Sequence, residues 1–138
     1  MRKETEELLH EIETNEDIRM YLDCNEEELL RESAMDFLNR KLHEKELSVS
    51  DVIKKSNNNA YLYKVFEGER RASRDILICI AFGLGLSIGD TQTLLRLSST
   101  ARLDPRNRRD AVTLYCISKS HDLDHLNELL FDIHENEY

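Results

Sequence analysis

The residues that interrupt helices are scarce in this sequence: its 138 residues include four glycines and one proline. Strands joined by tight turns need such residues at short intervals, so their scarcity favours helices joined by short connections. Because 40% of the residues are hydrophobic, the chain has enough apolar side chains to form a core. We therefore expect an all-α fold, with residues 1–138 in a single domain.

Long apolar runs and paired cysteines are also missing. No run approaches the roughly 20 residues needed to span a bilayer, and the longest, 76–86, is interrupted by two glycines. The start, MRKETEELLHEIE, is acidic and amphipathic, unlike a secretory signal. Cys24, Cys79 and Cys116 are odd in number and contain no CxxC pair, which is typical of reduced thiols. These absences predict a cytoplasmic protein without a membrane partner.

The sequence contains no grouping that indicates catalysis. There is no GxGxxG, P-loop or HExxH motif. His121 and His125 are one helical turn apart, but two histidines are too few for a closed metal site. Ser118 and Ser120 lie near His121 without a nucleophile elbow or a third catalytic partner. We therefore expect neither an enzyme nor a bound metal or cofactor.

The charge is distributed unevenly along the chain. The formal net charge of −9 argues at first against a nucleic-acid partner. However, residues 1–47 carry −8, residues 48–109 carry +5 and residues 110–138 carry −6. Docking depends on the local potential within a Debye length of roughly 8–10 Å more than on the total charge. The basic middle block therefore remains a candidate for binding nucleic acid.

Apolar residues recur at helical spacing along most of the chain and predict a series of helices. Their expected ranges are about 3–14, 18–22, 26–46, 48–55, 59–67, 73–82, 87–97, a stretch from 105 to 117, and 123–133. Ser48 or Ser50 can cap the helix at 48–55, and the asparagines 57–59 end it. Gly68 is placed for a left-handed C-cap. Ser73 caps an apolar helix that should be the buried centre of the fold.

The order of these pieces carries a resemblance. Two short helices separated by an Asn-rich turn are followed by a glycine, a basic stretch, a capped apolar helix and an L-G-L-S ending. Through LSVSDVIKKS, NAYLYKVFEGERRASRD and IAFGLGLSIGDT, residues 33–97 resemble the phage repressor/Cro-like, XRE-type helix-turn-helix family. The segments GERRASRD, LLRLSSTARLDPRNRRDAVTLYCI and HLNELL are similar to Firmicute-type regulators with an acidic helical N-terminus. Those regulators usually have a proline where this chain has Ala72.

The resemblance implies a five-helix repressor-like core at 33–98, with an acidic helical extension at 1–32 and a C-terminal helical pair at 99–138. It makes 59–67 the recognition helix, which enters the major groove of double-stranded DNA while the preceding helix braces against the backbone. The residues implied to face the bases are Asn59, Ala60, Tyr63 and Lys64, with Asn58 as the cap. Phosphate contacts would come from Ser48, Ser50, Arg70, Arg71 and Arg74. Asparagine pairs well with adenine, lysine reaches guanine, and alanine contacts the thymine methyl group.

The leading interpretation is a sequence-specific transcriptional regulator, which would act as a homodimer because such proteins read two half-sites. The alternative is a protein-interaction module that keeps the helix-turn-helix fold without binding DNA, as the net charge and Glu67 and Glu69 suggest. The apolar residues of the acidic N-terminal helices could cover the body of the domain, form a dimer interface or bind a protein partner. The acidic arm could also fold over the basic middle and inhibit DNA binding. The arginines at 106, 108 and 109 are expected to pair with the acidic arms or with a dimer mate.

Overall fold

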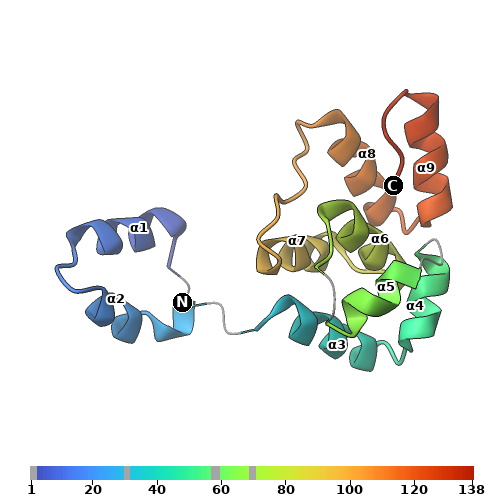
Figure 1. Cartoon of the computed structure of the whole chain (residues 1–138). Coiled ribbons are helices and arrows are strands. Elements are labelled where there is room, and N and C mark those ends of the chain that lie inside the picture. The colour runs from blue at the N-terminus through green and yellow to red at the C-terminus, as the bar shows by residue number, and fades with distance from the viewer. Residues whose placement is uncertain (1–2, 30–31, 57–59, 69–70) are drawn as a thin grey trace. The chain divides into compact units, whose positions relative to one another are not determined.

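The computed structural model describes residues 3–29, 32–56, 60–68 and 71–138, and every regular element in those ranges is helical. The elements are α1 Thr5–Thr14, α2 Ile18–Cys24, the 3₁₀ turn η1 Glu26–Glu28, α3 Ala34–Glu44, α4 Val49–Lys55, α5 Ala60–Phe66, α6 Arg74–Leu84, α7 Ile88–Leu97, α8 Arg108–Ser118 and α9 Leu123–Asp132 (Figure 1). The predicted all-α class is confirmed. None of these helices is long and apolar enough to cross a membrane.

The chain divides into two compact units, Met1–Arg31 and Glu32–Tyr138. In the first unit, α1 and α2 lie against one another, and α1 has no buried residue. Tyr21 and Asn25 are the buried residues of this unit among those described. Lys3 Nζ donates to Glu11 at 2.8 Å and to Asn25 at 2.7 Å, so polar contacts link α1 to the end of α2.

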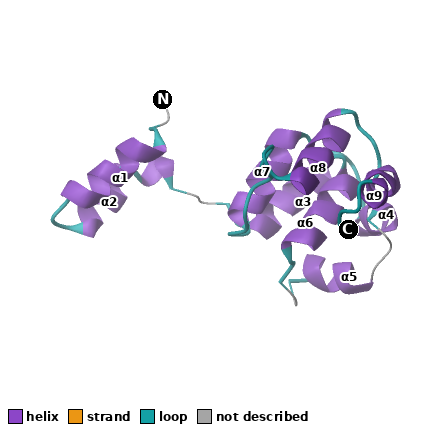
Figure 2. Cartoon of the chain, turned by 90° about the horizontal axis from the view of Figure 1, so that it is seen from above, coloured by secondary structure: helices purple, strands orange, loops and turns teal. Residues whose placement is uncertain are grey.

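The second unit is built around α6, which lies in its middle (Figure 2). Seven of the eleven α6 residues are buried, as the apolar sequence predicts. The helix α4 packs across α6 at Gly83, where a Cβ atom would collide with Ser56 Oγ and the Val52 carbonyl. Only glycine allows this close approach. Gly85 then ends the helix in the left-handed conformation, at φ 64°.

Serine and asparagine caps set where the helices of this unit begin. The hydroxyls of Ser48, Ser73 and Ser87 accept hydrogen bonds from amides of the first turns of α4, α6 and α7. Gly68 has φ 79°, as expected of a left-handed C-cap after α5. The asparagines predicted to end α4, at 57–59, lie outside the described residues.

Two predicted helix starts are wrong. The helix expected over 26–46 begins only at Ala34, because Ser33 and Asp36 form a reciprocal capping box, and residues 26–28 form the 3₁₀ turn instead. The helix expected to begin near Pro105 starts at Arg108, because the Asn107 side chain accepts from the Asp110 amide. In both cases the helix begins later than the apolar pattern indicated. It begins where a polar side chain can accept hydrogen bonds from the amides of the first turn.

The helices α8 and α9 pack against one another, α9 also packs against α6, and α8 against α7. Their shared core consists of Cys79, Cys116, Leu123, Leu126 and Leu130. The C-terminal Tyr138 closes this layer: its hydroxyl lies 2.9 Å from Thr113 Oγ1 and its amide donates to Asn127. The Arg109 guanidinium stacks 3.8 Å above the Tyr138 ring.

Candidate nucleic-acid interface

The short helix α5 buries one side and exposes the other. Leu62 and Val65 are almost fully buried in the core of the second unit. Tyr63, Lys64 and Glu67 are exposed, and their spacing places them on one face of the helix. Figure 2 shows α5 at the edge of the second unit.

Four exposed cationic side chains are associated with α4, α5 and the following segment. Lys54 and Lys55 lie in the last turn of α4, Lys64 in that of α5, and Arg71 before α6. No described residue forms a salt bridge with any of them. Lys54 and Lys55 are one turn from Asp51, whose pKa is lowered chiefly by hydrogen bonds from Ser48 and further by the two lysines. These cations are therefore available to phosphate groups.

The tyrosine at the start of α5 fixes the basic segment that follows the helix. Tyr61 is partly buried against the core, and its hydroxyl donates to the Arg71 carbonyl at 2.7 Å. This bond joins α5 to the chain entering α6, while the Arg71 side chain stays exposed. The backbone at Arg71 is thus held by the α5 helix itself.

The two predicted serines differ in their surroundings. Ser48 is exposed, and its hydroxyl accepts the Asp51 amide at 3.1 Å while its own amide donates to the Asp51 carboxylate. The hydroxyl proton of Ser48 can still be donated to a phosphate oxygen. Ser50 is half-buried in the first turn of the same helix.

The other predicted site residues are either outside the described residues or, in the case of Arg74, turned away from this surface. Asn58, Asn59 and Arg70 lie outside the described residues, as does the side chain of Ala60. Arg74 is described and is turned toward α8: it donates to both carboxylate oxygens of Asp110, at 2.9 and 3.2 Å. It also donates to the carbonyls of residues 101 and 102. Its donors therefore support the fold of the second unit.

The second arginine cluster is also occupied within the second unit. Arg109 forms a salt bridge with Asp75 at 3.0 Å and donates to the carbonyls of residues 136 and 137. Arg108 lies 3.6 Å from Glu135, in the acidic C-terminal arm as expected, and Arg106 lies 3.7 Å from Asp104. Arg106 pairs with a near neighbour in the sequence, whereas Arg108 and Arg109 pair with distant residues. No spacing rule predicts Asp75 as the partner of Arg109, or Asp110 as the partner of Arg74.

Comparison of the chain with protein families, with curated proteins and with solved structures found no match. The assignment of the surface therefore depends on its own geometry and charge.

Proposed function

We propose that this protein is a sequence-specific DNA-binding transcriptional regulator whose second unit contains a repressor-like helix-turn-helix. Two observations carry the proposal: the exposed face of α5, with Tyr63 and Lys64, and the exposed Lys54, Lys55 and Arg71, which form no salt bridge with any described residue. A short helix at the edge of a helical unit, anchored by Leu62 and Val65, is suited to the major groove.

In this mechanism the lysines and Arg71 first displace counterions and position the protein on phosphates. Lys64 then reaches base edges in the major groove, with Asn59 of the same segment as the second candidate for base contact. Glu67 on the exposed face disfavours non-specific approach to phosphates, so we expect weak binding to random DNA. The net charge of −9 does not oppose the mechanism, because the acids are concentrated in residues 1–47 and 110–138.

The proposal is tested by titrating the full chain with random and genomic DNA over a salt series. The logarithm of the affinity should fall with that of the salt concentration, by a slope of about −0.9 per phosphate contact. Lys64→Glu should weaken binding by about tenfold or more and reduce the slope by about one. Arg96→Glu, a charge reversal at an exposed position of α7, is the matched control and should leave binding unchanged. Absence of binding to every DNA at low salt would instead favour the protein-interaction module.

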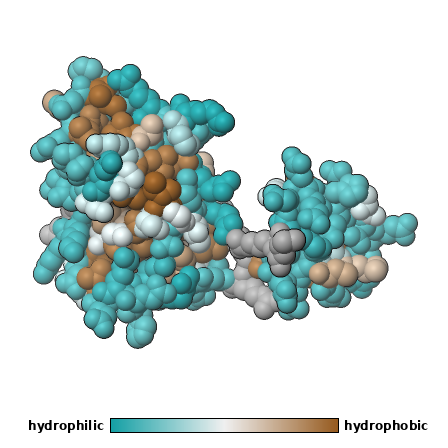
Figure 3. All heavy atoms as spheres, turned by 180° about the vertical axis from the view of Figure 1, so that it is seen from behind, coloured by the Kyte–Doolittle hydropathy of each residue, from teal (hydrophilic) through white to brown (hydrophobic). Residues whose placement is uncertain are grey.

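We further propose that the regulator is a homodimer that pairs through α8 and α9. A groove of about 310 Å³ between these helices is lined by Ala111, Val112, Leu129 and Ile133, with Tyr115 half-exposed at its edge. Figure 3 shows apolar side chains gathered into a band on the rear face of the second unit. A second copy is the partner that two half-sites require. Light scattering should report a dimer that Tyr115→Glu converts to a monomer, whereas Ile88→Glu, an exposed control on α7, should not.

The first unit supports a second candidate role, in binding a protein partner. Leu9, Ile12, Ile18 and Leu22 are 42–57% exposed among acidic residues, so its apolar stripe is not buried within the unit. Deleting residues 1–31 separates this role from inhibition of DNA binding. Inhibition predicts tighter DNA binding after the deletion, and a purely partner-binding role predicts no change.

A cytoplasmic location agrees with either role and with the three free thiols.

A further inference from the structure

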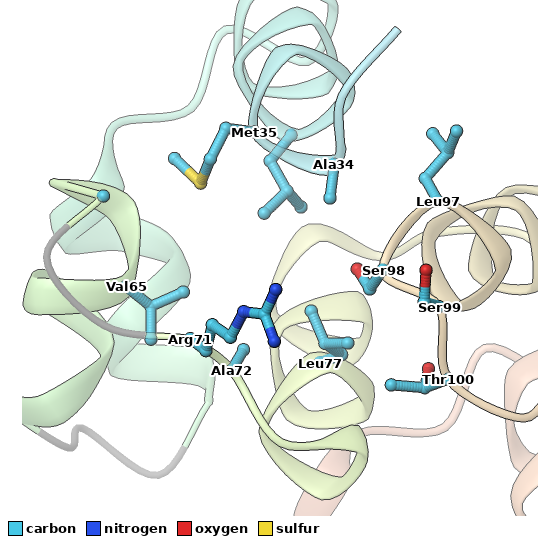
Figure 4. A pocket seen from close by; sticks show the side chains of 12 residues that line it. Ala34, Met35, Val65, Arg71, Ala72, Leu77, Leu97, Ser98, Ser99 and Thr100 are labelled. Atoms are coloured by element: carbon cyan, nitrogen blue, oxygen red, sulfur yellow. The ribbon is translucent and has the colours of Figure 1, made fainter. Parts of the chain in front are cut away.

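A cavity of about 650 Å³ lies where four segments of the second unit meet. Its walls are the first turn of α3, the end of α5 with Gly68, residues 71 and 72 before α6, the start of α6 and the end of α7 (Figure 4). The volume falls within the roughly 300–1,000 Å³ typical of small-molecule sites. Because segments distant in sequence form the walls, no sequence motif indicates this cavity.

One side of the cavity is apolar and the other is polar. The apolar wall consists of Ala34, Met35, Leu38, Val65, Leu77 and Leu97. On the polar side, the Arg71 guanidinium reaches into the cavity, and the Ser98 hydroxyl points toward it (Figure 4). Such a division suits a ligand with a charged head and an apolar body.

The two polar groups are left without partners by the described residues. None of the described residues accepts a hydrogen bond from the Arg71 guanidinium. The Arg71 carbonyl, by contrast, accepts one from the Tyr61 hydroxyl. Ser98 Oγ has less than 1 Å² of exposed surface and no hydrogen-bond partner. A buried hydroxyl without a partner is unfavourable, so a ligand oxygen that accepted from it would remove that penalty.

The surrounding backbone favours a negative ligand. The amides of residues 98, 99 and 100 already donate to carbonyls of the last turn of α7, which reduces the negative potential of that helix end. Ala34 and Met35 belong to the first turn of α3, where the helix dipole is positive. Arg71 therefore attracts an anion to the polar side of the cavity, the positive end of α3 adds to that attraction, and the capped end of α7 opposes it only weakly.

We infer that this cavity binds a small organic anion, a carboxylate or a phosphate monoester carried on an apolar body. Arg71 pairs with the anionic head in two parallel hydrogen bonds, and Ser98 donates a third. The apolar body packs against the α3, α5 and α6 side chains. This site is distinct from the exposed face of α5, although both use the chain between α5 and α6.

The anion also regulates DNA binding, a consequence that rests on the proposed function. Arg71 cannot pair with the ligand and with a DNA phosphate at the same time. The ligand therefore lowers DNA affinity, and by linkage DNA lowers ligand affinity by the same factor. Arg71 thus couples the two sites.

The test is calorimetric titration of the full chain, without DNA, with octanoate, octyl phosphate and the uncharged octanamide. At least one anion should bind about tenfold or more tightly than octanamide, since a hydrogen bond to a charged group is worth about 1.5–3 kcal/mol. The better of the two anions identifies the head group. Arg71→Gln should reduce its affinity by about tenfold or more, and Ser98→Ala by a smaller factor. Arg96→Gln, the same change at an exposed arginine of α7, should have no effect.

Equal binding of octanamide, equal binding by Arg71→Gln, or no binding of any probe at roughly 10 mM would overturn the inference. DNA titrations with and without saturating anion then test the coupling. Should DNA binding fail under all conditions while the anion still depends on Arg71, the proposed function is wrong and the cavity assignment stands. Should DNA bind while no anion binds, the cavity assignment is wrong and the proposed function stands.

Discussion

The two units of this chain contain the same kind of helical sequence pattern and differ in what becomes of it. In the first unit, Leu9 and Ile12 of α1 and Ile18 of α2 are apolar residues at helical spacing, yet 52, 44 and 57% of their surface is exposed. In the second unit, the corresponding apolar residues of α6 form the centre of a core, and Ile78 and Ile80 are fully buried. Helical periodicity therefore predicts a helix without predicting whether its apolar face is covered.

The difference implies that the two units are stabilised in different ways. The first unit depends on polar contacts such as those of Lys3, because Tyr21 is its one buried apolar side chain among the described residues. The second unit depends on the burial of apolar side chains, which stabilises a fold more per residue than exposed polar contacts do. We expect substitutions of the same type to have unequal effects in the two units.

The largest expected difference is between isoleucines. Ile78→Ala in α6 should lower the free energy of unfolding of the second unit by about 3–4 kcal/mol, since it opens a cavity in a fully buried site. Ile18→Ala, the same substitution in the first unit, should change stability by less than about 0.5 kcal/mol. Urea denaturation followed by circular dichroism measures both. A loss of several kcal/mol from Ile18→Ala would mean that the first unit's stripe is covered in solution.

The cysteines should show the next largest contrast. Burial, aided by the nearby Asp75 carboxylate, raises the pKa of Cys79 to about 11, and burial also raises that of Cys116. Cys24, in the first unit, is exposed. Because the thiolate is the reactive form, the two buried thiols should react with an aromatic disulfide at pH 8 about 100-fold more slowly than Cys24. Cys24→Ser should remove the fast phase, and Cys116→Ser should leave it. Two fast thiols per native chain would contradict the described burial.

The sequence predicts most of the helices of the second unit because local signals decide where each one begins and ends. Ser73 and Gly85 begin and end α6 as the capping rules require, and the apolar run between them is buried as expected. The pattern fails where a polar side chain competes with it. Ser33 and Asn107 cap later turns than the apolar residues indicated, so α3 and α8 are shorter than predicted.

The candidate site is less predictable than the fold. The exposure of Lys64 and Tyr63 follows from helical spacing once Leu62 and Val65 are recognised as core residues. The role of Arg74 does not follow, because its partner Asp110 is distant in sequence and brought near by α8 packing. The cavity and its unpartnered Ser98 hydroxyl are tertiary features for the same reason.

Arginine substitutions should give a smaller contrast than the isoleucines. Arg74 and Asp110 form a salt bridge of 2.9 Å with side chains 25 and 8% exposed, whereas Arg19 and Asp17 pair at 3.2 Å with 84 and 39% exposed. Arg74→Ala should cost about 2 kcal/mol, because it leaves the Asp110 carboxylate buried without a counter-ion. Arg19→Ala should cost less than about 0.5 kcal/mol. Equal losses in urea denaturation would show that burial does not separate the two pairs.

The smallest expected contrast concerns pH. The pKa of Asp17 is lowered chiefly by the Arg19 side chain, and that of Asp51 chiefly by the Ser48 backbone amide. Both carboxylates therefore contribute stability above the ordinary aspartate range, near pH 4, which is lost as pH falls through their lowered pKa values.

Salt distinguishes these two causes, because it screens an exposed charge pair more than a backbone hydrogen bond. In NMR titrations, 1 M salt should raise the pKa of Asp17 toward its usual value and leave that of Asp51 nearly unchanged. Arg19→Ala should reproduce the effect on Asp17 without salt, and Ser48→Ala should affect Asp51 alone. A salt response of equal size at both positions would indicate that Lys54 and Lys55, rather than the α4 cap, control Asp51. Those lysines would then be less available to phosphates than the proposed interface requires.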